Sequence, residues 1–144
     1  MSFISSVSRR LLLILTLTCY ICRNGPVSAL ESCSQSCFDS CHKVCIAPAK
    51  ECYQQGHKNN SRFSCEASQT CVQGCYYDNA CLLSCDKTNR CSQYCDSSEC
   101  TSTCKAGVDH CSQGFNSGVG RGTCSSKKCE QSCHADGCAA NKLY

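Results

Sequence analysis

The sequence predicts a small disulfide-rich protein, built mostly from short α-helical hairpins and loops, with two tandem cysteine modules and little hydrophobic core. Two observations lead to this fold class. The chain has 21 cysteines in 144 residues, and a cysteine content above about 8–10% in a short secreted chain is typical of a disulfide scaffold. Many of these cysteines are four residues apart, a spacing that places two side chains on one face of a helix.

The N-terminal segment predicts secretion. Arg9 and Arg10 precede a short apolar run that begins at Leu11, and this run is shorter than the roughly 20 residues that a transmembrane helix needs. Small residues follow at Val27, Ser28 and Ala29, as at a signal-peptide cleavage site. We therefore expect residues 1–29 to be a signal peptide and the mature protein to be secreted and extracellular, where disulfides form.

Removal of the signal peptide changes the composition. Cys19 and Cys22 leave with it, so 19 of the 21 cysteines remain, and the loss of three arginines leaves 11 basic residues against 11 acidic ones. The mature chain then has a formal net charge of zero. A nucleic-acid or membrane partner is not expected, because such partners favour a basic surface.

Large apolar side chains are scarce in the mature chain. It has 12 leucine, isoleucine, valine and phenylalanine residues and no tryptophan. Ordering a chain costs about 1.5 kcal/mol per residue, which so few side chains cannot offset, whereas a native disulfide typically contributes about 2–5 kcal/mol. We expect the disulfides to replace the missing core and the reduced protein to be unfolded.

The cysteine spacing repeats along the mature chain. From Cys33 the steps between successive cysteines are 4, 4, 4, 7, 13, 6, 4, 6 and 4, and from Cys91 they are 4, 5, 4, 7, 13, 5, 4 and 5. We interpret these steps as a ten-cysteine module at residues 30–87 and a nine-cysteine module at residues 88–144. Counting on four residues from Cys138 reaches Lys142, which stands where the first module has its last cysteine.

Cysteines at positions i and i+4 of one helix are poor partners for each other, because their Cβ atoms lie about 5–6 Å apart and a disulfide needs about 3.5–4.5 Å. They can instead bridge two antiparallel helices. This rule predicts Cys71–Cys85 with Cys75–Cys81 in the first module and Cys91–Cys104 with Cys95–Cys100 in the second. Cys133 and Cys138 are further candidates for disulfide bonding.

Some alternatives stay open. A Cys85–Cys91 bridge competes with the hairpin pairing. Residues 33–45 can form either one helical stripe that ends at Pro48 or, as we favour, two short helical turns with a bend. Under the hairpin pairing Cys129 has no partner, which suggests a disulfide-linked dimer or a covalent attachment to a matrix.

The segments predicted to form helix pairs joined by disulfides resemble the disulfide-linked helical hairpins of small toxins and plant defence peptides. The chain as a whole is similar to the small cysteine-rich secreted proteins of the cnidarian skeletal organic matrix. This second resemblance implies a durable extracellular component.

No catalytic, cofactor or metal site is expected. The chain lacks the motifs of hydrolases and metalloproteases, so we do not expect an enzyme. Zinc is the natural alternative for cysteine clusters, but an oxidising compartment favours disulfides. The four histidines also do not recur at matching positions of the two modules; they are His42, His57, His110 and His134.

Two polar segments are the expected recognition surfaces. The stretches between Cys52 and Cys65 and between Cys111 and Cys124 have equal length and are expected to be exposed loops. The first contains Asn59 in an N-glycosylation acceptor sequence, and the second contains a glycine string at residues 118–122 that predicts flexibility.

The sequence therefore predicts a secreted, non-enzymatic structural protein of an extracellular matrix or coat, for which a biomineral is one setting. Its expected partners are matrix components or a disulfide-linked copy of itself. The alternative is a secreted effector, such as a toxin, a defence peptide or a protease inhibitor. For an effector the candidate contact residues are Tyr76 with Tyr77 and Lys127 with Lys128.

Overall fold

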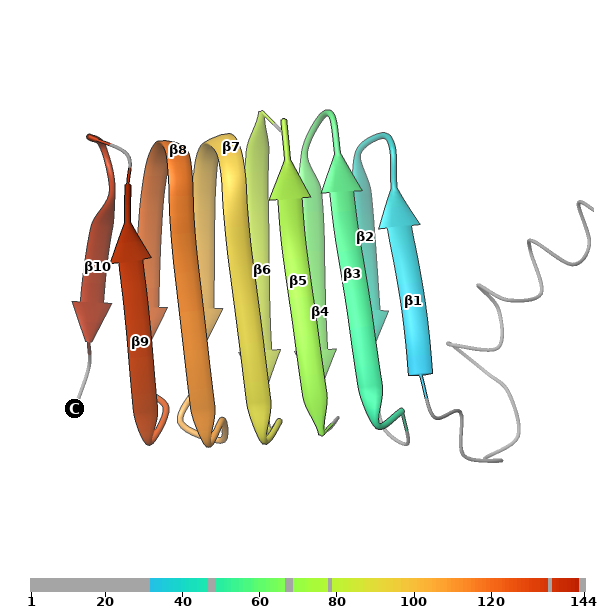
Figure 1. Cartoon of the computed structure of the whole chain (residues 1–144). Coiled ribbons are helices and arrows are strands. Elements are labelled where there is room, and N and C mark those ends of the chain that lie inside the picture. The colour runs from blue at the N-terminus through green and yellow to red at the C-terminus, as the bar shows by residue number, and fades with distance from the viewer. Residues whose placement is uncertain (1–31, 47–48, 67–68, 78, 135, 143–144) are drawn as a thin grey trace, which may run out of the picture.

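The computed structural model describes residues 32–46, 49–66, 69–77, 79–134 and 136–142, and these residues form a parallel β-solenoid without helices (Figure 1). Its ten strands are β1 (Ser32–Cys37), β2 (Cys41–Cys45), β3 (Glu51–His57), β4 (Ser61–Glu66), β5 (Thr70–Tyr76), β6 (Ala80–Asp86), β7 (Arg90–Cys104), β8 (His110–Cys124), β9 (Lys128–Cys133) and β10 (Ala139–Lys142). The predicted fold class of short α-helical hairpins is therefore wrong.

The solenoid has two parallel sheets, which we name the front and back sheets from the view in Figure 1. The front sheet contains β1, β3, β5, the first halves of β7 and β8, and β9; the back sheet contains β2, β4, β6, the second halves of β7 and β8, and β10. One coil of the chain takes 18 to 20 residues, because Cys33 pairs in register with Cys52, Cys71 with Cys91 and Cys111 with Cys129.

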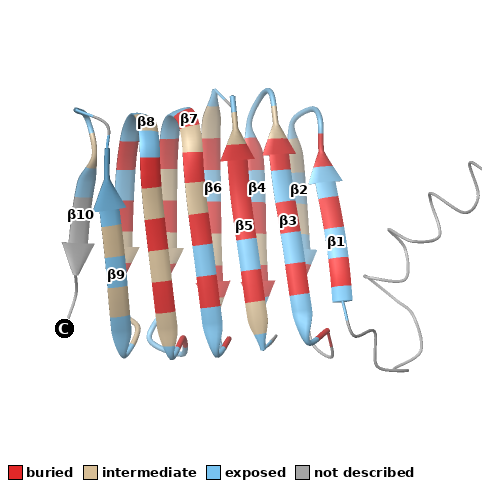
Figure 2. Ribbon diagram, viewed as in Figure 1, coloured by how far each residue is buried: buried red, intermediate tan, exposed pale blue. Residues whose placement is uncertain are grey.

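The cysteine spacing is a strand spacing. In β1 buried and exposed residues alternate, so that Cys33, Gln35 and Cys37 point inward, and positions i and i+4 of a strand share one face just as they do on a helix. Residues 33–45 accordingly form two strands joined by a turn, and neither helical arrangement is present. Figure 2 shows the buried positions as bands that run across neighbouring strands of the front sheet.

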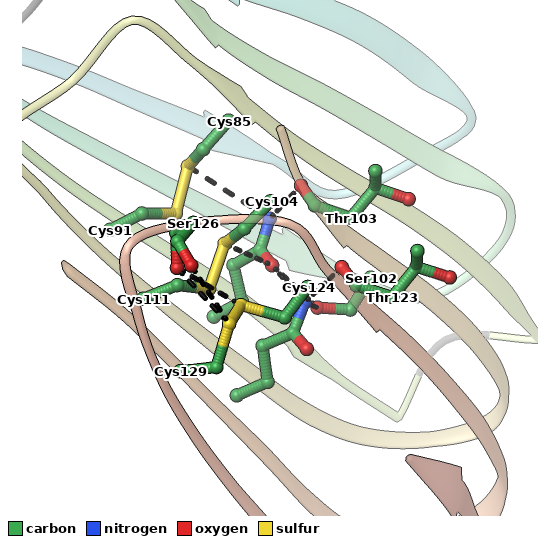
Figure 3. Close-up of a disulfide and its surroundings, with 12 residues drawn as sticks. Cys85, Cys91, Ser102, Thr103, Cys104, Cys111, Thr123, Cys124, Ser126 and Cys129 are labelled. Atoms are coloured by element: carbon green, nitrogen blue, oxygen red, sulfur yellow. Dashed lines mark hydrogen bonds between the residues drawn. A yellow bond between two sulfur atoms is a disulfide. The ribbon is translucent and has the colours of Figure 1, made fainter. Parts of the chain in front are cut away.

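One edge of the solenoid is closed by disulfides between successive coils. Each joins a cysteine at the end of a back-sheet strand to a cysteine at the start of the next front-sheet strand. The pairs are Cys45–Cys52, Cys65–Cys71, Cys85–Cys91, Cys104–Cys111 and Cys124–Cys129. Three of them are drawn in Figure 3. These bonds tie each coil covalently to the next.

The opposite edge is closed by disulfides within a coil. They are Cys37–Cys41, Cys75–Cys81, Cys95–Cys100 and Cys133–Cys138. In the second coil Gly56 and Ser61 occupy the register positions of this pair. In the fifth coil Phe115 and Gly120 occupy them. The two steps of 13 residues between successive cysteines arise because these two coils lack the within-coil pair. Each expected module therefore spans three coils. The duplication itself stays a prediction.

A ladder of six glutamines, of which all but Gln131 are buried, runs through the interior. From Gln54 onward, each amide nitrogen donates to the amide oxygen of the glutamine in the preceding coil, at distances of 2.7–2.9 Å. Most of these nitrogens also donate across the interior to a back-sheet carbonyl, such as that of Ser84 or Thr123. The ladder consists of Gln35, Gln54, Gln73, Gln93, Gln113 and Gln131.

Few large apolar side chains complete the interior. Phe63, Leu83 and Phe115 are at most 2% exposed, and most other buried apolar residues in the described part of the chain are cysteines. The expected signal peptide, residues 1–29, lies outside the described residues. Among those described, no helix has the length and apolar character needed to cross a membrane.

Candidate functional site

The cysteine pairs differ in part from those expected. The structure contains Cys75–Cys81 and Cys95–Cys100, and it also joins Cys133 to Cys138. The Cys71–Cys85 and Cys91–Cys104 pairs are absent, because each of these cysteines bonds to the adjacent coil. The competing Cys85–Cys91 bridge is the one present.

Cys129 is not the unpaired residue that the hairpin pairing suggested. It is bonded to Cys124, with a Cα–Cα distance of 6.1 Å, within the usual range for a disulfide. The hydroxyl of Ser126 lies 3.0 Å from the Cys124 sulfur and 3.2 Å from the Cys129 sulfur (Figure 3). Cys129 is therefore not available for the covalent attachment that the hairpin pairing suggested.

Buried sulfur atoms approach one another at the N-terminal end of the solenoid. The Sγ atoms of Cys33, Cys45 and Cys52 lie within 4.8 Å of one another, as do those of Cys52, Cys65 and Cys71. Zinc binds cysteine as a thiolate, whereas these groups contain the Cys45–Cys52 and Cys65–Cys71 disulfides. The clusters are thus a consequence of stacked disulfides and do not form a thiolate set.

Asn59 lies in the turn between β3 and β4. Its side chain is exposed, its φ is 65°, and its amide donates to the Asp39 carboxylate at 3.2 Å. Ser61 of the acceptor sequence is buried at the start of β4. Glycosylation of Asn59 stays a prediction.

The two segments expected to be recognition loops are mostly strands. Residues 52–65 form β3 and β4 around a short turn, and residues 111–124 lie within β8. Gly118 has a φ of 68° and marks the bend of β8, while Gly120 and Gly122 are buried. The glycine string is therefore part of the solenoid wall and is not a flexible loop.

Lys127 and Lys128 form exposed ion pairs at the edge of the solenoid. Lys127 lies 2.6 Å from the Asp109 carboxylate, and Lys128 lies 3.3 Å from Glu130. The hydrogen bond from Lys127 to Asp109 and the charge of that carboxylate raise the pKa of Lys127. Fully exposed pairs of this kind contribute little to stability, and the two lysines already have acidic neighbours.

An aromatic ladder crosses the outer surface of the front sheet. The rings of Phe38 and His57 stack with centroids 5.6 Å apart, and the rings of His57 and Tyr76 stack at 5.5 Å. Tyr76 and Tyr94 follow, tilted, at 5.7 Å. The amide of Asn116 donates to the Tyr94 hydroxyl. The ladder arises because these residues lie on neighbouring coils. Tyr77, the second effector candidate, lies outside it and is 80% exposed.

Two hollows flank Tyr94 on this surface. One, of about 190 Å³, lies among the rings of Tyr53, Tyr76 and Tyr94 and contacts Gly74 and Val72. The other, of about 300 Å³, shares Tyr94 and Val72 with the first and extends to the strands beyond Tyr94, where its lining includes Gly114, Asn116, Ser92, Ser112, Ser132 and His134. We name these the first and second hollows. Together they make the front sheet the candidate binding surface.

Sequence reasoning missed this surface, although a signal for it exists. Each coil begins with Cys-x-Gln, and this motif occurs six times, at Cys33, Cys52, Cys71, Cys91, Cys111 and Cys129. Aligning the chain on that motif places Tyr94 between Gly74 and Gly114 in one row. This motif alone is therefore enough to derive the register of the coils, and with it the placement of the tyrosines on neighbouring strands.

The back sheet also offers a groove. About 300 Å³ in volume, it is lined partly by His42 and Arg62 and by the outward Leu82 and Thr101. Its lining mixes charged and apolar side chains without a repeated pattern.

No protein-family model matches this chain, and no curated protein or solved structure matches it.

Proposed function

We propose that this protein is a secreted, non-enzymatic structural component of an extracellular matrix or coat. The observation that supports the proposal is the covalent closure of the solenoid along both edges by nine disulfides among the described residues. Extensive disulfide bonding is typical of extracellular proteins.

Stiffness follows from how the coils are joined. Parallel strands stack along the solenoid axis at about 4.8 Å per coil, so backbone hydrogen bonds, the glutamine ladder and the between-coil disulfides all act along that axis. The between-coil disulfides fix the corners at which the chain passes from one coil to the next, which limits how far a coil can open. Such a rod suits a durable building element better than a protein that must change shape.

Resistance to proteolysis is a second consequence. Proteases bind an extended chain that has separated from its neighbours, and here the strands are paired within the sheets. The disulfides also limit local opening, because they close short segments at the corners of the coils, with paired cysteines four to seven residues apart. A matrix protein exposed to extracellular proteases benefits from both properties.

The proposal is tested by extracting native tissue in steps, first with salt, then with detergent, and finally with denaturant plus reductant. An antibody against the folded protein follows each fraction and stains intact tissue. We expect the protein in the last fraction, together with staining of the extracellular matrix. A freely soluble monomer in extracellular fluid would contradict the matrix role and support a secreted effector.

A further inference from the structure

The first and second hollows exist because glycines interrupt a row of outward side chains. The row runs across the front sheet as Ser36, Gln55, Gly74, Tyr94, Gly114 and Ser132. A Cβ atom on Gly74 would lie 3.0 Å from the Tyr76 ring, and one on Gly114 would lie 3.5 Å from the Tyr94 ring. Each tyrosine ring thus lies over a glycine and forms a wall beside open space.

Both hollows are uncharged. Their linings contain tyrosine, serine, glutamine, asparagine, valine and glycine with one histidine, and they contain no aspartate, glutamate, lysine or arginine. The front sheet has charged residues at Glu51, Arg90, Asp96 and Glu130, and none of these four lines either hollow. The surface therefore matches a ligand that is polar but carries no charge.

Tyrosine rings beside hydroxyl and amide groups suit sugars. One side of a sugar ring presents C–H groups, which pack on an aromatic ring through apolar contact, and its hydroxyls need hydrogen-bond partners. Tyr53 is 43% exposed and offers its ring at the first hollow, while Ser112 and Asn116 offer polar groups at the second. Neither requirement involves a charge.

The surface is also preorganised. Tyr94 packs against Tyr76 on one side, at a centroid distance of 5.7 Å, and accepts a hydrogen bond from Asn116 on the other. These contacts restrict the ring before any ligand arrives, which lowers the entropy lost on binding. The strands beneath are fixed by disulfides such as Cys75–Cys81 and Cys95–Cys100.

The spacing favours a linear chain. Gly74 and Gly114 are two coils apart, which is roughly 10 Å along the solenoid axis. In a β-1,4-linked polysaccharide every second sugar ring presents the same face. A chain that lies along the axis can therefore place two such rings in the two hollows, with Tyr94 between them.

We infer that the front sheet binds a neutral, linear polysaccharide through the two hollows on either side of Tyr94. The inference rests on the proposed matrix role, for which it names the partner class. It assigns Tyr94 as the central contact, with Tyr53 at the first hollow and the polar groups near Asn116 at the second.

The test measures binding of the folded, disulfide-bonded protein to chitohexaose, cellohexaose and a heparin hexasaccharide by isothermal titration calorimetry. We expect at least one neutral hexasaccharide to bind and heparin not to bind. Tyr94→Ala should weaken the binding roughly tenfold or more. Tyr77→Ala is the matched control, since it removes an exposed tyrosine outside the hollows, and it should leave the affinity unchanged.

Three results would overturn the inference: no binding of either neutral glycan, tighter binding of heparin, or equal losses in Tyr94→Ala and Tyr77→Ala. If Tyr94→Ala does not fold, Tyr53→Ala at the exposed rim takes its place with the same expectation of weaker binding. The glycan-binding experiment and the tissue-extraction experiment can each give a negative result independently of the other. A protein that stays in the insoluble matrix fraction without binding glycans retains the structural role and loses this site.

Discussion

Gly120 faces the ring of Phe115 so closely that a Cβ atom on the glycine would lie 2.5 Å from Phe115 Cδ1. In register these two residues occupy the places of Cys95 and Cys100, which form a disulfide in the preceding coil. The fifth coil thus closes its edge with a buried ring against a glycine. The phenylalanine fills the volume that two sulfur atoms take elsewhere.

Gly120→Ala should destabilise the protein by about 1–3 kcal/mol, because the new methyl group forces the Phe115 ring out of its place. The matched control is Gly114→Ala in the same strand, where a Cβ atom would find its nearest neighbour at an ordinary 3.5 Å. The control should change the free energy of unfolding by no more than about 0.5 kcal/mol. Guanidinium unfolding without reductant measures both variants. Equal losses would show that Phe115 does not fill this space.

Replacing both residues, as Phe115→Cys with Gly120→Cys, should form a tenth disulfide in the described part of the chain. The equivalent pairs have Cα–Cα distances of 6.0–6.4 Å, so the backbone is already placed for the bond. Intact mass and thiol titration of the denatured, unreduced protein should show no added free thiols.

The single variant Phe115→Cys is the control for the double change. It loses most of a buried ring without gaining a bond, and large-to-small changes of this kind cost about 3 kcal/mol or more. The double variant should recover much of that loss, since a short-range disulfide contributes about 2–3 kcal/mol. Two more titratable thiols in the double variant than in the wild type would contradict the assigned register.

The sequence allowed the disulfide-rich character and the scarcity of apolar side chains to be predicted, but not the strands. A half-buried strand is recognised when apolar and polar residues alternate. Here the inward residue between two cysteines is a glutamine, as in Cys33, Gln35 and Cys37. A polar residue at an inward position interrupts the apolar–polar alternation that would indicate a strand. The remaining i, i+4 spacing of cysteines fits a helix and a strand equally well.

The true period was hidden for a related reason. Counting cysteines alone gives a spacing of 57–59 residues, because the second and fifth coils lack the within-coil disulfide. The coil of 18 to 20 residues emerges only when glutamine is counted with cysteine. Tyr53 and Tyr94 then fall on the front sheet, but the stacking of their neighbours and the hollows depend on side-chain packing that no spacing contains.

The glutamine ladder gives a direct test of the interior. Gln54 is 1% exposed; it donates to Gln35 at 2.7 Å and accepts from Gln73 at 2.8 Å. Gln54→Leu removes both bonds and leaves two buried amides short of a partner, which should cost about 2 kcal/mol or more. Gln55→Leu is the matched control, because this neighbouring glutamine points to solvent.

Thermal unfolding followed by circular dichroism compares the two leucine variants. The Gln55→Leu protein should melt close to the wild type, and the Gln54→Leu protein should melt several degrees lower. If Gln54→Leu were as stable as Gln55→Leu, the ladder would be dispensable and apolar filling would suffice.

Reduction should unfold the protein. Its buried apolar residues are mostly cysteines, and the glutamines are satisfied only while the coils stay stacked. We expect the reduced and alkylated chain to lose its strand signal in circular dichroism and to be cut rapidly by proteases. Alkylation without reductant is the control and should change neither property. A reduced sample that still melts cooperatively would show that the side chains alone hold the fold.

Trypsin mapping of the denatured but unreduced protein decides between the two pairings of the between-coil cysteines. The choice is open to experiment because the sulfur atoms of neighbouring coils lie close together, as those of Cys52, Cys65 and Cys71 do. Cleavage after arginine and lysine isolates residues 63–87, 91–105 and 106–121. In the structure the Cys85–Cys91 and Cys104–Cys111 bonds join these three peptides.

We therefore expect residues 91–105 to elute only in a cross-linked species that also contains residues 63–87 and 106–121, and to separate from them after reduction. The hairpin pairing makes a different prediction, since Cys91–Cys104 and Cys95–Cys100 would both lie within residues 91–105. That peptide would then elute alone, four hydrogens lighter than its reduced form. Its appearance would contradict the covalent linkage between coils and, with it, the main support for a rigid rod.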